Sequence, residues 1–116
     1  MSDPECLIVL STIDDAVQAR RVADRVVESG HAACVNILPG ITSVFRWEPD
    51  SGDPAHAGVQ AEGEVLLLIK TSAAAYDALE QVLRREHTYD LPEIVAVPMT
   101  RGLPAFLQWI GESTSS

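Results

Sequence analysis

Three segments of the chain are apolar at nearly every position instead of alternating between apolar and polar residues. They cover residues 7–10, 65–69 and 94–97. Continuous apolar runs of this length are typical of inner strands that are buried on both faces of a sheet. A fourth β-prone segment covers 33–47 and is interrupted by Leu-Pro-Gly at 38–40. Because proline cannot donate to a ladder and glycine tolerates positive φ, this segment predicts one long strand with a kink.

Two segments between these runs repeat their apolar residues at steps of three and four, which is the period of an amphipathic helix. The first begins after the Asp-Asp pair at 14–15, which suits a helix N-cap, and ends at Gly30. The second covers about 76–87, and a short last helix begins around Pro104. We expect residues 113–116 to form a frayed tail.

The resulting order is strand-helix-strand twice, followed by a terminal helix. This is the split βαβ arrangement of ferredoxin-like α/β (α+β) sandwiches, and it uses residues 1–116 as a single domain. The stretch 49–63 lacks an apolar rhythm and is expected to be an unusually long hairpin connection. Because the first and second strands are not neighbours in this topology, Cys6 and Cys34 are predicted to stay reduced thiols.

The apolar strands also predict self-association. Two helices cover only one face of a four-stranded sheet, yet these strands are apolar on both faces. About six side chains would lie on the second face, and at roughly 1.5 to 3 kcal/mol each their burial is comparable to the stability of a whole domain. We therefore expect other copies of the chain to cover this face in a closed symmetric assembly. The alternative is that the last helix and the long hairpin fold back over the same sheet.

Composition and charge exclude several classes of partner. A chain of 116 residues with 47% hydrophobic residues supports one core and no second domain. Eight basic against 17 acidic residues give a net charge of -9, which disfavours a nucleic-acid partner. The longest aliphatic run, 65–69, is too short to span a bilayer, and the first residues lack the basic start of a signal peptide. The sequence therefore predicts a cytoplasmic protein without a membrane partner.

The densest group of polar residues lies at 86–93, between the second helix and the last inner strand. Glu86 and His87 are the best candidates for a mixed oxygen and nitrogen site that binds a divalent metal ion. Since coordination needs a neutral imidazole while a helix C-terminus favours the charged ring, metal affinity should fall below neutral pH. The structural alternative is that His87 caps the last helical carbonyls while Tyr89 fixes the loop.

A second candidate site is a cleft for a small molecule. Lys70 ends the central strand, where it would pair with Glu93 or bind an anionic ligand. Tyr89 follows the second helix, and Trp47 ends the long strand with a large amphipathic ring that suits subunit packing or ligand stacking. No nucleophile elbow and no phosphate-binding glycine loop occurs in the sequence, so we predict that the protein is not an enzyme.

Four sequence blocks, spread over most of the chain, together resemble the CutA divalent-cation-tolerance family. The blocks are AACVNILPG at 32–40, SVFRWE at 43–48, LLIKT at 67–71 and HTYDLPE at 87–93. The resemblance implies a ferredoxin-like fold, a homotrimer whose sheets face inward, and a link to copper and other divalent ions.

The resemblance also bears on the metal ligands. Some members of the family place a proposed copper ligand, a cysteine, at the end of the first strand, where this chain has Ser11, a poor ligand for soft copper. Glu86 and His87 occupy the other proposed ligand positions.

Two functional hypotheses follow from the sequence. The first is a homotrimeric, cytoplasmic protein of metal tolerance that binds a divalent cation such as Cu²⁺ and catalyses no reaction. The alternative is a regulatory trimer like the nitrogen-regulatory P-II proteins, which would bind a small molecule between subunits through Lys70, Tyr89 and Glu93.

Overall fold

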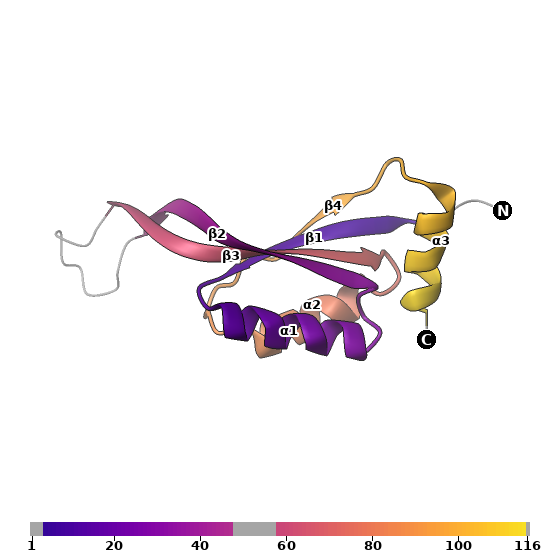
Figure 1. Cartoon of the computed structure of the whole chain (residues 1–116), viewed down its shortest axis with the longest axis horizontal. Helices are drawn as coiled ribbons and strands as arrows, with labels where there is room; N and C mark the ends of the chain where they lie inside the picture. The colour runs from indigo at the N-terminus through magenta and orange to yellow at the C-terminus, as the bar shows by residue number, and fades with distance from the viewer. Residues whose placement is uncertain (1–3, 48–57, 116) are drawn as a thin grey trace.

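The computed structural model describes residues 4–47 and 58–115. Figure 1 shows a four-stranded sheet with two helices against one face and a third helix at one end. The elements follow in the order β1 (Cys6–Ile13), α1 (Ala16–Glu28), β2 (Cys34–Trp47), β3 (Gly58–Ser72), α2 (Tyr76–Glu86), β4 (Val95–Pro98) and α3 (Pro104–Ser113).

The strand order in the sheet is β2-β3-β1-β4, and all three neighbouring pairs are antiparallel. This order confirms the predicted split βαβ fold, in which each helix connects two strands that are not neighbours. The strand β3 separates β1 from β2, so Cys6 and Cys34 lie on strands that do not pair, and neither forms a disulfide. No helix within 4–47 and 58–115 is long and apolar enough to cross a bilayer.

The main core lies between the sheet and the pair α1 and α2. Its sheet side includes Val9 and Leu67, and its helix side includes Val22 and Leu83, all fully buried. The chain enters α1 at Asp15, whose carboxylate accepts a hydrogen bond of 2.8 Å from the backbone N–H of Val17. The predicted helix N-cap is therefore confirmed.

Residues 41–47 of β2 and 58–64 of β3 continue past the rest of the sheet as a two-stranded arm (Figure 1). Their register shifts between Leu38 and Ile41, and Gly40 has a φ of 78°, which confirms the predicted kink. The expected connection over 49–63 is too long, because β3 already begins at Gly58. The first part of β3 is rich in glycine and alanine, so it lacks the alternation of apolar and polar residues that predicts a strand. The rest of the expected connection lies outside the described residues.

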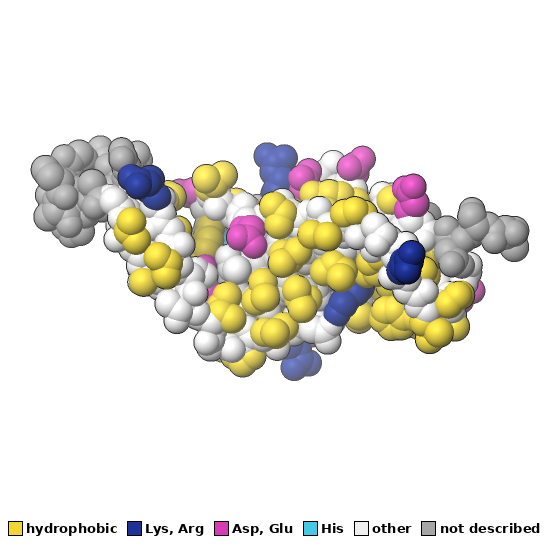
Figure 2. Space-filling view, turned by 90° about the horizontal axis from the view of Figure 1, so that it is seen from above, with side chains coloured by type: hydrophobic (Ala, Val, Ile, Leu, Met, Phe, Trp, Pro, Cys, Tyr) yellow, Lys and Arg dark blue, Asp and Glu magenta, His cyan; other side chains and the backbone are white. Residues whose placement is uncertain are grey.

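The face of the sheet opposite α1 and α2 is apolar and open. Cross-strand register and alternation place on it the side chains of Ile8, Leu10, Leu66, Leu68, Val95 and Val97. The four on the inner strands are half-buried, while Val95 and Val97 are each 50% exposed. Figure 2 looks onto this side of the molecule and shows hydrophobic side chains gathered over its middle. The sequence-based expectation of a second apolar face therefore holds for the described chain.

The last helix covers only one end of that face. It packs through Leu107 and Ile110 against Cys6 at the end of the sheet where β1 begins (Figure 1). The expected frayed tail needs correction, since Ser113 still belongs to α3 and the next residue is docked. Thr114 is buried, and its hydroxyl lies 2.7 Å from that of Ser72.

Candidate functional site

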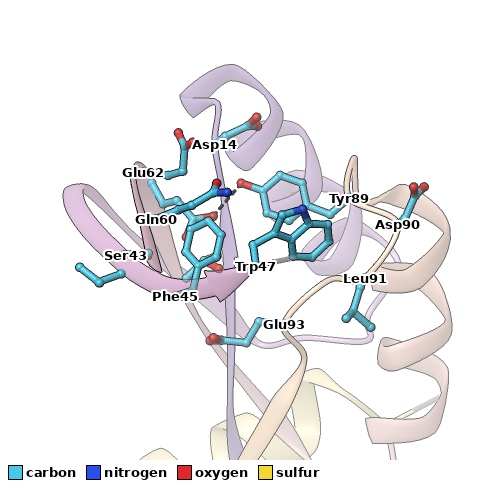
Figure 3. A pocket seen from close by; sticks show the side chains of 13 residues that line it. Asp14, Ser43, Phe45, Trp47, Gln60, Glu62, Tyr89, Asp90, Leu91 and Glu93 are labelled. Carbon is cyan, nitrogen blue, oxygen red and sulfur yellow. Dashed lines mark hydrogen bonds between the residues drawn. The ribbon is translucent and has the colours of Figure 1, made fainter. Parts of the chain in front are cut away.

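A pocket of about 800 Å³ lies between the arm and the loop that follows α2. Figure 3 shows the side chains around it. The described residues that line it are Thr12, Asp14, Ser43, Val44, Phe45, Trp47, Gln60, Glu62, Glu64, Tyr89, Asp90, Leu91 and Glu93.

The arm supplies one wall of the pocket through strand alternation. Phe45 is paired with Gln60, and Ser43 with Glu62, in the antiparallel register of β2 and β3. Residues that are paired across two strands, and residues two positions apart on one strand, point to the same face. The kinked arm therefore presents aromatic and acidic side chains together on one face, next to Tyr89 (Figure 3).

Tyr89 is held in the pocket by a short hydrogen bond. Its hydroxyl donates to Oε2 of Glu64 over 2.6 Å. Burial of the phenol, followed by this bond to a negative carboxylate, raises the pKa of Tyr89 well above its ordinary value. The phenol therefore remains protonated at any physiological pH and keeps its proton for the hydrogen bond to Glu64.

His87 contacts two residues that line the pocket, Thr12 and Tyr89, and holds the loop after α2 in place. Its Nε2 lies 2.8 Å from the carbonyl oxygen of Thr12, and its Nδ1 accepts a hydrogen bond of 3.0 Å from the backbone N–H of Tyr89. A carbonyl only accepts, so Nε2 carries the proton and Nδ1 does not. The side chain is buried, and its ring contacts that of Tyr89 at a centroid distance of 4.7 Å.

Glu86 points to α1, where Arg21 binds it twice. Nη1 of Arg21 donates to Oε2 of Glu86 over 2.6 Å, and Nη2 donates to its backbone oxygen over 2.7 Å. The hydrogen bond from Arg21 lowers the pKa of Glu86 below its ordinary value. Glu86 therefore binds Arg21 of α1, whereas His87 binds the backbone of Thr12 and Tyr89.

Within the described residues, no three His, Cys, Asp or Glu side chains lie close enough together to hold a metal ion. A metal at His87 would have to displace the hydrogen bond at Nδ1 or the one at Nε2. Ser11 lies on the helix side of β1, fully buried, and its hydroxyl has no hydrogen-bond partner among the described residues. A metal bound by His87 and Glu86 stays a prediction.

The structure brings together three of the four residues predicted for the cleft. Trp47, Tyr89 and Glu93 all line the pocket. Lys70 lies elsewhere, on the open face of the sheet, where it is paired with Ile8 on one side and Cys34 on the other. The described charged lining of the pocket is therefore entirely acidic.

Sequence reasoning missed the acidic wall that β3 contributes. Glu62 and Glu64 lie in or next to the stretch that was expected to be a loop. The signal in the sequence is the two-residue spacing of these glutamates, which in a strand places both side chains on the same face. Asp14, expected to lie at the start of α1, also lines the pocket, from the turn between β1 and α1.

Fold and pocket together define a ferredoxin-like domain with an acidic, aromatic cleft beside a two-stranded arm. The profile of the CutA1 divalent ion tolerance protein family matches residues 7–113. The chain therefore belongs to the CutA1 divalent ion tolerance family, which confirms the resemblance seen in the sequence and indicates a role in metal tolerance.

Relatives that carry the CutA name include proteins from bacteria and plants. The divalent-cation tolerance protein CutA of Thermus thermophilus is 39% identical over 107 residues, which are 92% of this chain and 96% of that protein. The chloroplastic protein CutA of Arabidopsis thaliana is 36% identical over 108 residues, and the match spans 93% of this chain but 55% of that protein. The crystal structure of CutA1 from Oryza sativa superposes with a TM-score of 0.87 at 34% identity, covering 97% of this chain and 96% of the other.

Proposed function

We propose that this chain is a cytoplasmic, homotrimeric, non-enzymatic protein of divalent-cation tolerance that binds cations in the pocket beside its arm. The observation that carries the proposal is the charge of the pocket: Asp14, Glu62, Glu64, Asp90 and Glu93 line it, without a described basic side chain among them. Carboxylates gathered in one concave site raise the local concentration of cations and repel anions. The family to which the chain belongs supports a role of this kind.

The residues of the pocket favour weak binding of hard divalent cations. Carboxylate and phenol oxygens are hard donors, which suit ions of the magnesium, calcium and manganese class. Since no three described acidic, histidine or cysteine side chains converge, a divalent ion in one subunit keeps much of its water and binds weakly. Cu²⁺ at His87 and Glu86 is the competing site, and it would cost hydrogen bonds that now hold the loop to β1 and α1.

The open face of the sheet supports the homotrimer. The inner-strand side chains on that face, such as Leu10 and Leu68, are already half-covered by their neighbours, so each gains less than the full 1.5 to 3 kcal/mol of burial. The total is on the order of 5 to 10 kcal/mol per subunit, which is smaller than the sequence suggests but is still comparable to the stability of a domain. Sister subunits are the simplest cover, and the resemblance to the CutA family implies that three copies assemble.

Titration calorimetry separates the two cation sites. The titrants are Cu²⁺, Zn²⁺ and Mn²⁺ at neutral pH, and the variants are a double Glu62→Gln and Glu64→Gln change, His87→Ala, and Glu28→Gln as a control on the exposed side of α1. The proposal predicts that the double variant loses most of the Mn²⁺ heat while Glu28→Gln retains it. Unchanged Mn²⁺ binding in the double variant would refute the pocket as the cation site. Loss of Cu²⁺ binding in His87→Ala alone would assign copper to the competing site.

The P-II-like regulatory trimer remains a second candidate, and the size of the pocket favours it. A volume of about 800 Å³ with aromatic walls is suited to a small organic molecule. The position of Lys70 outside the pocket removes the cation that was expected to bind an anionic ligand. A thermal-shift screen of nucleotides and small anions tests this reading, since a ligand that binds only the native state raises the melting temperature.

A further inference from the structure

We infer that the pocket is built for an organic cation, specifically an aliphatic di- or polyamine, in preference to a bare metal ion. The inference rests on the proposed function in one respect only, namely that the pocket binds cations. It adds the chemical class of the ligand, which follows from the size of the pocket, the nature of its walls and the spacing of its carboxylates.

The size and the donor arrangement both favour an organic ligand. The pocket holds about 800 Å³, within the range of roughly 300 to 1,000 Å³ that is typical of sites for small organic molecules. A single metal ion would leave most of this space to water. Chelation also needs converging ligands, and no three described acidic, histidine or cysteine side chains converge. An ammonium group needs only one or two acceptors and a negative field.

The aromatic walls favour a ligand that carries carbon as well as charge. Phe45, Trp47 and Tyr89 lie together in the pocket, with the carboxylates of Asp14 and Glu62 close by (Figure 3). Trp47 is 49% exposed, which leaves much of its ring available for contact. Rings attract an ammonium group over their faces, and they also cover methylene groups that would otherwise face water. A hydrated metal ion gains little from such walls.

The carboxylates of the arm are spaced for two positive charges. Glu62 and Glu64 lie two residues apart on β3, which separates their backbones by about 6.6 Å on the same face. Two ammonium groups joined by a chain of about four carbons span a similar distance. Tyr89 adds an acceptor at the Glu64 end, because its hydroxyl donates its proton to Glu64 and keeps its own lone pairs free.

The fluorescence of Trp47 reports directly on occupation of the pocket. The chain has two tryptophans, so the measurement uses a Trp109→Phe background, in which a residue of α3 outside the pocket is removed. The titrants are butane-1,4-diamine, spermidine, the uncharged isostere butane-1,4-diol, and Mn²⁺. We expect a saturable change with both amines and none with the diol. We also expect about a tenfold or greater loss of amine affinity when Glu62 and Glu64 become Gln.

A Trp47→Leu change in the otherwise unmodified chain separates the two ligand classes by calorimetry. It should weaken amine binding several-fold and leave Mn²⁺ binding unchanged, while Glu28→Gln should affect neither. Mn²⁺ binding that depends on Glu62 and Glu64, without amine binding, would overturn the inference and leave the proposed function standing. Absence of binding by amines and Mn²⁺ alike would overturn both. Equal binding of the diol and the diamine would show that charge does not select the ligand, and it would also overturn the inference.

Discussion

Replacement of Ser11 by alanine should stabilise the protein, which is an unusual outcome for a buried position. The Ser11 hydroxyl is fully buried in β1 and has no hydrogen-bond partner among the described residues. A buried polar group without a partner costs about 1 to 3 kcal/mol. Alanine removes that cost and loses only the packing of one oxygen, so we expect the free energy of unfolding to rise by about 1 kcal/mol.

Chemical and thermal denaturation, compared at equal protein concentration, measure this change. A gain of about 1 kcal/mol corresponds to an increase in melting temperature of about 3 to 5 °C for a domain of this size. The matched control is Ser29→Ala at an exposed residue, where the hydroxyl donates to the carbonyl of Val26 over 3.1 Å and no gain is expected. A destabilised Ser11→Ala variant would refute the reasoning, since it would show that the hydroxyl has a favourable partner in the folded state.

A Ser11→Cys change extends the prediction to metal binding. It restores the cysteine that the family resemblance associates with copper, at a position that lies fully buried on the helix side of the sheet. The neighbouring candidate, His87, already uses both ring nitrogens. We therefore expect no gain in Cu²⁺ affinity, measured by calorimetry. A tenfold or greater gain would show that the helix side of β1 opens to metal, contrary to the packing described above.

Three further predictions concern the open face, the helix layer and the pocket. A Leu68→Glu change on the open face should dissociate the assembly, as measured by sedimentation. The control Val17→Glu, on the outer side of α1, should leave the assembly intact. An intact assembly with Leu68→Glu would contradict the inferred interface. The lowered pKa of Glu86 means that its contact with Arg21 stabilises the fold above the ordinary value of 4.5 and that this contribution is lost as pH falls further. An Arg21→Met variant should therefore be less stable at neutral pH and should lose less stability on acidification, which unfolding measured at several pH values would test; parallel pH profiles would refute it. A Tyr89→Phe change should cost about 1 kcal/mol of stability, because a short hydrogen bond to a carboxylate is lost, and an unchanged denaturation midpoint would refute this.

The elements of the fold could be predicted because local signals agree with the packing. The apolar steps of α1 lie against the core, and Asp15 caps it as its position before the apolar period indicates. The interruption of the apolar pattern at Gly40 coincides with a shift in the register between β2 and β3, and Gly40 has the positive φ that glycine tolerates. The beginning of β3 was hidden because glycine and alanine give no period-two contrast, even though Glu62 keeps the alternation.

The candidate site was only partly predictable, because it depends on contacts between distant segments. Trp47 and Tyr89 are 42 positions apart in the numbering, and the kinked arm brings them to one pocket. The environment of His87 depends on the carbonyl of Thr12, which no local pattern reveals. Lys70 was expected at the cleft because it ends an apolar run, yet strand alternation turns it to the open face.

The solution mass of the unmodified protein, followed by sedimentation equilibrium during serial dilution, tests the central claim most directly. If sister copies cover the apolar side of the sheet, the mass stays at three times the 12.5 kDa of one chain to low concentration. A mass of one chain, with circular dichroism that shows an intact fold, would contradict the account.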